Sequence, residues 1–109
     1  MPWDLYLLDP ETLHVERVLA NVWDPSRLHW SPDSQWLVYN TERGNNQAQG
    51  VWLFSLQTRK QTLVHAGEYW DMAWSPDGRA LLVVQCRDTF CQTAAAWKYD
   101  VSSIVTPPK

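Results

Sequence analysis

The sequence predicts an all-β protein built from a repeated unit of short antiparallel strands. The tetrapeptide Trp-Ser-Pro-Asp occurs at residues 30–33 and recurs at residues 74–77, an offset of 44 positions. The chain contains eight tryptophans among 109 residues, and six of them occupy three equivalent positions of the repeat. No stretch of about eleven or more residues has the 3.6-residue hydrophobic period of an amphipathic helix. The repeat therefore takes precedence over local preferences in assigning the fold.

The strands of each unit follow from apolar runs that are bounded by polar turns. We predict first strands at 28–30 and 72–74, second strands at 36–41 and 80–85, third strands at 51–56 and 97–101, and a fourth strand at 62–64. Two leading strands, at 5–8 and 15–19, correspond to a third and a fourth strand. Residues 1–20 and 67–109 are thus partial units, and residues 21–66 are a complete one. The run 94–96 is three alanines, which favour a helix locally, and only the repeat register assigns it to a strand.

The Ser-Pro-Asp segments predict tight turns between first and second strands. The motif residues are Trp30, Ser31, Pro32 and Asp33 in the first copy and Trp74, Ser75, Pro76, Asp77 and Gly78 in the second. Proline presets φ, serine opens the turn, and glycine tolerates positive φ where the next strand begins. The first copy has Ser34 in place of Gly78, and the second has Ala80 in place of Trp36. We assign the motif residues a structural role, with both serines as turn openers rather than nucleophiles.

Four antiparallel strands in about 44 residues are typical of a β-propeller blade. The two motif copies, each followed by an apolar strand and an apolar-aromatic strand, resemble the WD40-like repeat of the TolB family of β-propellers. Similar blades occur in the propellers of prolyl-oligopeptidase-type peptidases. The resemblance covers nearly the whole chain, and it implies propeller blades of four antiparallel strands.

The chain is too short for a closed propeller. At 44 residues a unit, 109 residues encode about 2.5 units, whereas closed propellers contain roughly four to eight blades. We therefore expect an incomplete ring in one chain. Either the chain is a segment of a longer propeller, or two, three or four identical chains close rings of four, six or eight blades. In the second arrangement the strand at 97–101 duplicates the role of the strand at 5–8.

Composition limits the chemistry that the chain supports. The net charge is −3 and the basic residues are scattered singly, so we expect no nucleic-acid binding. No apolar run approaches the roughly 18–20 residues of a membrane span, and no basic-then-apolar leader opens the sequence. The sequence has no Gly-x-Ser-x-Gly motif and its three histidines are dispersed, so we expect no catalytic residues and no enzyme activity. We also expect no metal site and no cofactor, because ligand-type side chains are not clustered.

Two cysteines, Cys86 and Cys91, flank the connection between the second and third strands of the last unit. A disulfide across this hairpin is compatible with cross-strand Cα distances of roughly 5.5 Å. Two free thiols in a reducing compartment are the alternative, and the spacing does not decide between them. The compartment stays open: resemblance to the TolB family implies a periplasmic or an extracellular location, and a disulfide would suit either.

The candidate ligand-facing residues are Trp23, Asp24, Tyr69, Trp70 and Asp71. They lie in predicted loops that enter the innermost strands, near the axis where propellers commonly meet their ligands. An aromatic ring beside a carboxylate can stack on a sugar or hold a cationic group. Packing between blades is the alternative, and the recurrence of these residues with the repeat favours it. The polar loop 42–49 is interpreted as a solvated connection.

The expected function is that of a non-enzymatic β-propeller module for binding or assembly. Its expected partners are further copies of itself, which close the ring, or the remainder of a longer propeller, together with proteins or small ligands bound at the loops. One alternative is a fragment of the gating propeller of a prolyl-oligopeptidase-like serine peptidase. The other is a lectin-like sugar binder.

Overall fold

The computed structural model describes residues 2–42, 44, 47–86 and 92–105. These residues form nine strands and one short helix: β1 (Pro2–Leu8), β2 (Val15–Trp23), β3 (Ser26–Trp30), β4 (Trp36–Thr41), β5 (Gly50–Ser55), β6 (Gln61–Ala66), β7 (Asp71–Trp74), β8 (Ala80–Cys86), β9 (Ala94–Asp100) and α1 (Ser102–Val105). None of the described segments is a helix of the length and apolar character that a bilayer crossing needs.

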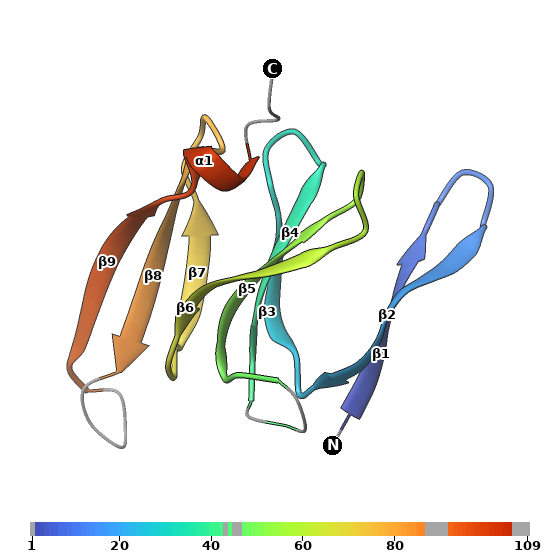
Figure 1. Ribbon diagram of the computed structural model, residues 1–109. Coiled ribbons are helices and arrows are strands. Elements are labelled where there is room, and N and C mark those ends of the chain that lie inside the picture. The colour runs from blue at the N-terminus through green and yellow to red at the C-terminus, as the bar shows by residue number, and fades with distance from the viewer. Residues whose placement is uncertain (1, 43, 45–46, 87–91, 106–109) are drawn as a thin grey trace.

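The strands lie in three antiparallel sheets, each formed by strands that follow one another in the chain. The N-terminal sheet is β1-β2, the middle sheet is β3-β4-β5-β6, and the C-terminal sheet is β7-β8-β9. Figure 1 shows the three sheets in succession, with the C-terminal sheet on the left and the β1-β2 hairpin on the right. The predicted all-β, antiparallel fold class is confirmed.

The alanine run 94–96 forms a strand, as the repeat register predicts, although alanine favours a helix locally. Ala94, Ala95 and Ala96 belong to β9 and pair with the end of β8, so the residues that favour a helix locally form a strand. The partner strand supplies backbone hydrogen bonds in a continuous ladder. The predicted loop at Trp23 is wrong, because β2 extends through that residue and pairs it with Pro2.

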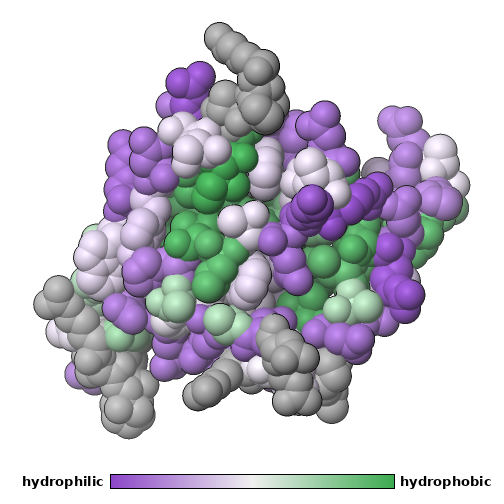
Figure 2. Space-filling model, viewed as in Figure 1, coloured by the Kyte–Doolittle hydropathy of each residue, from purple (hydrophilic) through white to green (hydrophobic). Residues whose placement is uncertain are grey.

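The two central strands of the middle sheet, β4 and β5, are buried on both faces. Between the middle and C-terminal sheets lies a first core, whose fully buried members include Val38, Leu53 and Leu81. Between the N-terminal and middle sheets lies a second core, which includes Tyr39 and Phe54. Because successive side chains of a strand point to opposite faces, neighbouring residues of β4 and β5 enter different cores. Figure 2 shows apolar atoms gathered between the middle sheet and the sheet on either side.

The two end sheets each have one uncovered face. On the N-terminal sheet, Tyr6 is 57% exposed and Leu8 is 59% exposed, and on the C-terminal sheet Leu82 is 47% exposed. Apolar side chains on a sheet face are normally buried against another layer. Each end sheet therefore presents apolar side chains that no other described sheet covers.

Candidate functional site

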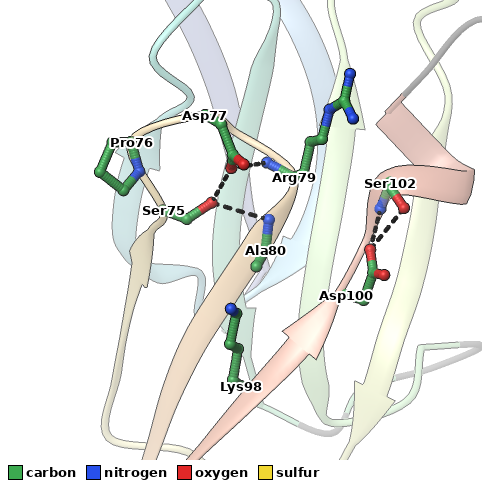
Figure 3. Close-up of a pocket in the computed structure, with 8 residues that line it drawn as sticks. All are labelled: Ser75, Pro76, Asp77, Arg79, Ala80, Lys98, Asp100 and Ser102. Atoms are coloured by element: carbon green, nitrogen blue, oxygen red, sulfur yellow. Dashed lines mark hydrogen bonds between the residues drawn. The ribbon is translucent and has the colours of Figure 1, made fainter.

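A hydrogen-bond network holds the second Ser-Pro-Asp turn, as Figure 3 shows. The Ser75 hydroxyl donates to Asp77 Oδ1 at 2.6 Å and accepts the backbone N–H of Ala80 at 3.0 Å. Asp77 Oδ1 also accepts the backbone N–H of Arg79 at 3.0 Å. The hydrogen bond from Ser75, followed by that from Arg79, lowers the pKa of Asp77. The hydroxyl thus has both its donor and an acceptor partner inside the turn.

The first turn repeats this network 44 residues earlier. The Ser31 hydroxyl donates to Asp33 Oδ1 at 2.5 Å and accepts the backbone N–H of Trp36 at 3.0 Å. The Asp33 carboxylate accepts the N–H of Gln35, and these bonds lower its pKa, with Ser31 the larger cause. The side chains of both motifs close turns, and neither serine hydroxyl is directed to a histidine by these bonds.

Trp23 packs against the loop 42–49 rather than facing a ligand. The Gln47 side chain accepts the backbone N–H of Trp23 at 3.2 Å and donates to its carbonyl oxygen at 3.3 Å. A Cβ added at Gly44 would lie 2.0 Å from Trp23 Cγ, so the indole lies directly on that glycine. The interpretation of this loop as a solvated connection is therefore wrong for Gly44 and Gln47, which contact the tryptophan.

Asp24 lies just after β2, and its side chain hydrogen-bonds to Trp3 of β1. Its Oδ1 accepts the indole N–H of Trp3 at 3.1 Å. Its backbone has a positive φ of 44°, a conformation that a non-glycine residue keeps only when its surroundings impose it. Asp24 and Trp23 therefore contact neighbouring protein groups, as the packing alternative requires.

Tyr69 lies in the β6–β7 connection, but its side chain belongs to the first core. Its hydroxyl hydrogen-bonds to His65 Nδ1, and its backbone oxygen accepts the Asn40 side-chain amide at 2.8 Å. Burial, followed by the hydrogen bond with Tyr99, raises the pKa of Tyr69 to about 12. Tyr69 thus links the middle and C-terminal sheets.

Trp70 lines a cleft of about 460 Å³ between the middle sheet and the β6–β7 connection. The start of β3, the end of β4 and the β6–β7 connection line this cleft. The side chains that give the cleft its chemistry are Arg27, Glu42, Gln49, Glu68 and Trp70. The cleft thus combines one guanidinium, two carboxylates, an amide and an aromatic ring.

Arg27 and Trp70 meet across the cleft. The guanidinium carbon lies 5.0 Å from the centroid of the indole, which is within cation–π range. Trp70 remains 53% exposed, so the ring is accessible beside the arginine. Arg27 has a positive φ of 55°, and it belongs to the three extra residues, 25–27, that distinguish the first unit from the second. Arg27 was not predicted as a site residue, and this insertion was the signal in the sequence that could have indicated it.

Asn40 forms the floor of the cleft and is a second residue that was not predicted from the sequence. It is 8% exposed, its amide donates to the Tyr69 carbonyl, and its oxygen accepts the Ser26 hydroxyl. Asparagine is depleted in strands, so its place within the apolar run 36–41 was the available signal. Asn40 thus joins the start of β3 to the β6–β7 connection, and both line the cleft.

Asp71 is the first residue of β7 rather than part of a loop, and it pairs with His29 of β3. The distance from His29 Nε2 to Asp71 Oδ1 is 2.9 Å. Desolvation raises the pKa of Asp71, but the hydrogen bonds from His29 and Met72 and the charges of His29 and Arg27 outweigh it and lower that pKa. The pair joins the two innermost strands.

The remaining sequence predictions concern cysteines and metals. Cys86 ends β8, whereas Cys91 lies outside the described residues, so the disulfide between them stays a prediction. Within the described ranges there is no group of three or more histidine, cysteine, aspartate or glutamate side chains that could hold a metal ion.

Comparisons with known proteins place the fold among β-propellers. No protein-family model matches the chain. TolB from Acinetobacter baumannii is similar with a TM-score of 0.72 and 18% identity, over 92% of this chain and 24% of TolB. The acylaminoacyl peptidase of Pyrococcus horikoshii is similar with a TM-score of 0.69 and 16% identity, over 92% of this chain and 19% of the peptidase.

The chain thus spans about a quarter of the length of TolB and about a fifth of the length of the peptidase. Identities this low show the fold alone. The resemblance inferred from the two motif copies is confirmed at that level, and the chain has the fold of a β-propeller segment.

Proposed function

We propose that this chain is a non-enzymatic binding and assembly module whose ring is closed by further copies of itself. It binds its ligand in the cleft between the middle sheet and the β6–β7 connection. The observation that carries the binding proposal is the contact of the Arg27 guanidinium with the half-exposed Trp70 ring beside open space. Concave sites with a few convergent polar groups are where ligands commonly bind.

The mixed charge of the cleft favours a protein segment as ligand. Arg27 can bind a carboxylate, whereas Glu42 and Glu68 can accept hydrogen bonds from cationic or amide groups. An extended peptide carries both kinds of group along its length. A purely neutral ligand would offer these charged groups no oppositely charged partner.

A non-enzymatic role is supported by the way the candidate nucleophiles and bases are used. The Ser31 and Ser75 hydroxyls each donate to an aspartate of their own turn. His29 pairs with Asp71, and His65 with Tyr69. Nucleophilic catalysis needs a base next to the attacking hydroxyl, and these contacts direct both kinds of group elsewhere.

A second candidate is a segment of the gating propeller of a serine peptidase. It is favoured by the structural similarity to the acylaminoacyl peptidase, of which the chain spans 19%. A reading frame that continues from Lys109 into a hydrolase domain would support this candidate over an independent module. A lectin-like role has less support, because Arg27 lies over one face of the Trp70 ring on which a sugar would stack.

The binding proposal is tested with one labelled protein on two arrays, one of random peptides and one of glycans. We expect peptide binding that is lost in Arg27→Ala and Trp70→Ala and kept in Leu13→Ala, which alters an exposed side chain away from the cleft. Far-UV circular dichroism checks that each variant is folded. Binding to glycans alone, or peptide binding that both cleft variants retain, would contradict the proposal.

A further inference from the structure

A second cavity lies between the middle and C-terminal sheets, and it shares only Tyr69 with the cleft beside Arg27. Its volume is about 290 Å³, and residues of β6, the β6–β7 connection, β8 and β9 form its walls. Four of its six lining residues carry aromatic rings. We call this cavity the aromatic pocket, and its lining residues are His65, Ala66, Tyr69, Gln85, Trp97 and Tyr99.

The position of His65 is apolar at the other boundary between sheets. His65 of β6 is paired with Val51 of β5. Leu19 of β2 is paired with Leu5 of β1, at the same place in the preceding unit. His65 therefore occupies the repeat position of Leu19, which packs against the second core. An imidazole thus stands where an aliphatic side chain provides the packing between the other two sheets.

Two further lining residues also have apolar equivalents. In the repeat, Tyr69 occupies the position of Val22, and Tyr99 occupies the position of Phe54. Val22 is 2% exposed and Phe54 is 1% exposed, and both belong to the second core. Burial of a polar group costs free energy unless that group is hydrogen-bonded. Packing between sheets therefore does not by itself account for two phenolic hydroxyls and an imidazole at these positions.

Contacts between the rings hold the walls of the aromatic pocket at different angles. The ring centroids of His65 and Tyr69 are 5.6 Å apart, with 80° between the ring planes. The ring centroids of His65 and Tyr99 are 5.0 Å apart, with 33° between the planes. The Tyr69 hydroxyl also hydrogen-bonds to His65 Nδ1. Trp97 is 40% exposed, so its ring is the wall that solvent reaches most easily.

The composition of the aromatic pocket favours a positively charged ligand with an apolar surface. Its described lining residues include no carboxylate, ammonium or guanidinium group. The faces of aromatic rings carry partial negative charge and attract cations. A lysine-type ammonium is strongly hydrated and needs hydrogen-bond acceptors. A quaternary ammonium has no N–H donors and spreads its charge over methyl groups, so aromatic walls alone can surround it.

We propose that the aromatic pocket binds a trimethylammonium group, with the rings of His65, Trp97 and Tyr99 around the cation. This site goes beyond the proposed function, because it uses neither Arg27 nor Trp70. Ligand pockets commonly have volumes of roughly 300–1,000 Å³. A cavity of about 290 Å³ is at the small end of that range, which suits a compact head group better than an oligosaccharide.

The test compares choline with its neutral analogue, in which a carbon atom replaces the nitrogen. Saturation-transfer NMR on the methyl signal of each ligand measures binding to the folded protein. We expect the neutral analogue to bind about tenfold more weakly, because it has the same shape but no charge for the rings to attract. In spectra of the tryptophan indole N–H groups, choline should shift one signal, and that signal should be the one missing from Trp97→Leu.

Three variants locate the site. Trp97→Leu removes the exposed wall, and we expect choline binding to fall by about tenfold. Trp97→Phe keeps an aromatic face and should retain most of the binding. Trp30→Leu makes the same change at another half-exposed tryptophan, which does not line the aromatic pocket, and should bind choline as the wild type does. Circular dichroism checks that each variant is folded, as we expect because Trp97 does not belong to the described first core.

Three results would overturn this site. They are equal binding of choline and its neutral analogue, choline binding that Trp97→Leu retains, and a folded wild type that binds no choline. Acetyl-trimethyllysine amide presents the same group on a side chain. Tighter binding of this compound than of choline would assign the group to a methylated lysine, and weaker binding would assign it to a free ligand, so both support the site. Peptide binding in the cleft is tested with Arg27→Ala and does not depend on these outcomes.

Discussion

The middle and C-terminal sheets are built from the same repeat, yet only the middle sheet has its central strands buried on both faces. Their Ser-Pro-Asp turns have the same hydrogen bonds, and their second and third strands pair in the same way. They differ at the position of Leu53, which is fully buried, and Lys98, which is exposed. The two copies of the repeat thus share the hydrogen bonds of their turns. The residues on their sheet faces differ according to whether another sheet covers that face.

The largest expected effect comes from exchanging these two residues. Leu53→Lys places a charge without a partner in the first core, and we expect a loss of about 3–5 kcal/mol in the free energy of unfolding. Lys98→Leu, the reverse exchange on an exposed face, should change it by less than about 0.5 kcal/mol. Urea unfolding of both variants measures the difference. Similar values for the two would contradict the assigned burial.

The two motif tryptophans give a smaller contrast. Trp74 packs against the first core and its indole N–H donates to the His29 carbonyl at 3.1 Å, whereas Trp30 is 48% exposed. We expect Trp74→Ala to cost about 3 kcal/mol and Trp30→Ala to cost about 1 kcal/mol. Denaturant melts test this order. A loss below about 1 kcal/mol for Trp74→Ala would contradict its place at the core.

The ends of the two turns differ by one residue type. Ser34 has a φ of 60° and Gly78 has a φ of 72°, so both occupy the left-handed region that glycine tolerates best. We expect Ser34→Gly to stabilise the chain by about 0.5 kcal/mol and Gly78→Ser to destabilise it by about 1 kcal/mol. A Cβ at Gly78 would have its nearest neighbour, Pro32 Cδ, at 3.5 Å, so the cost is in the backbone. Thermal melts that show the same sign for both changes would refute this.

The smallest expected effect is on the unfolding free energy at acidic pH, and it comes from the turn carboxylates Asp33 and Asp77. The pKa values of Asp33 and Asp77 are lowered from 3.8 in the folded chain. A carboxyl with a lower pKa when folded stabilises the chain above its unfolded pKa, and this stability is lost as the pH falls through the folded value. We expect unfolding free energy to decline below about pH 4, and less steeply in the double variant Asp33→Asn with Asp77→Asn. Urea melts from pH 5 to pH 2, roughly the range in which carboxylates titrate, measure how the unfolding free energy changes with pH. Gln57→Ala removes no carboxyl, so its unfolding free energy should change with pH as that of the wild type does. Equal slopes for all three proteins would count against it.

Strands were predicted from the sequence more accurately than site residues. The second strand at 36–41 has the predicted bounds, and the repeat register placed the alanine run in β9. Asn40 and Arg27 were missed because their roles depend on Tyr69 and Trp70, which lie across the interface between sheets. Trp23 and Trp70 were both placed in loops because the segments around them recur, but β2 continues through Trp23.

The sequence by itself determined the class of fold, because turn chemistry and strand period act over a few neighbouring residues and recur at a fixed spacing. Only the tertiary structure decided which copy of each repeated residue is buried, which segments form the cleft, and which sheet faces stay uncovered. The physical reason is that burial depends on the neighbouring sheet. Whether a residue such as Leu53 or Lys98 is buried therefore depends on how the sheets pack, which the sequence around it does not specify.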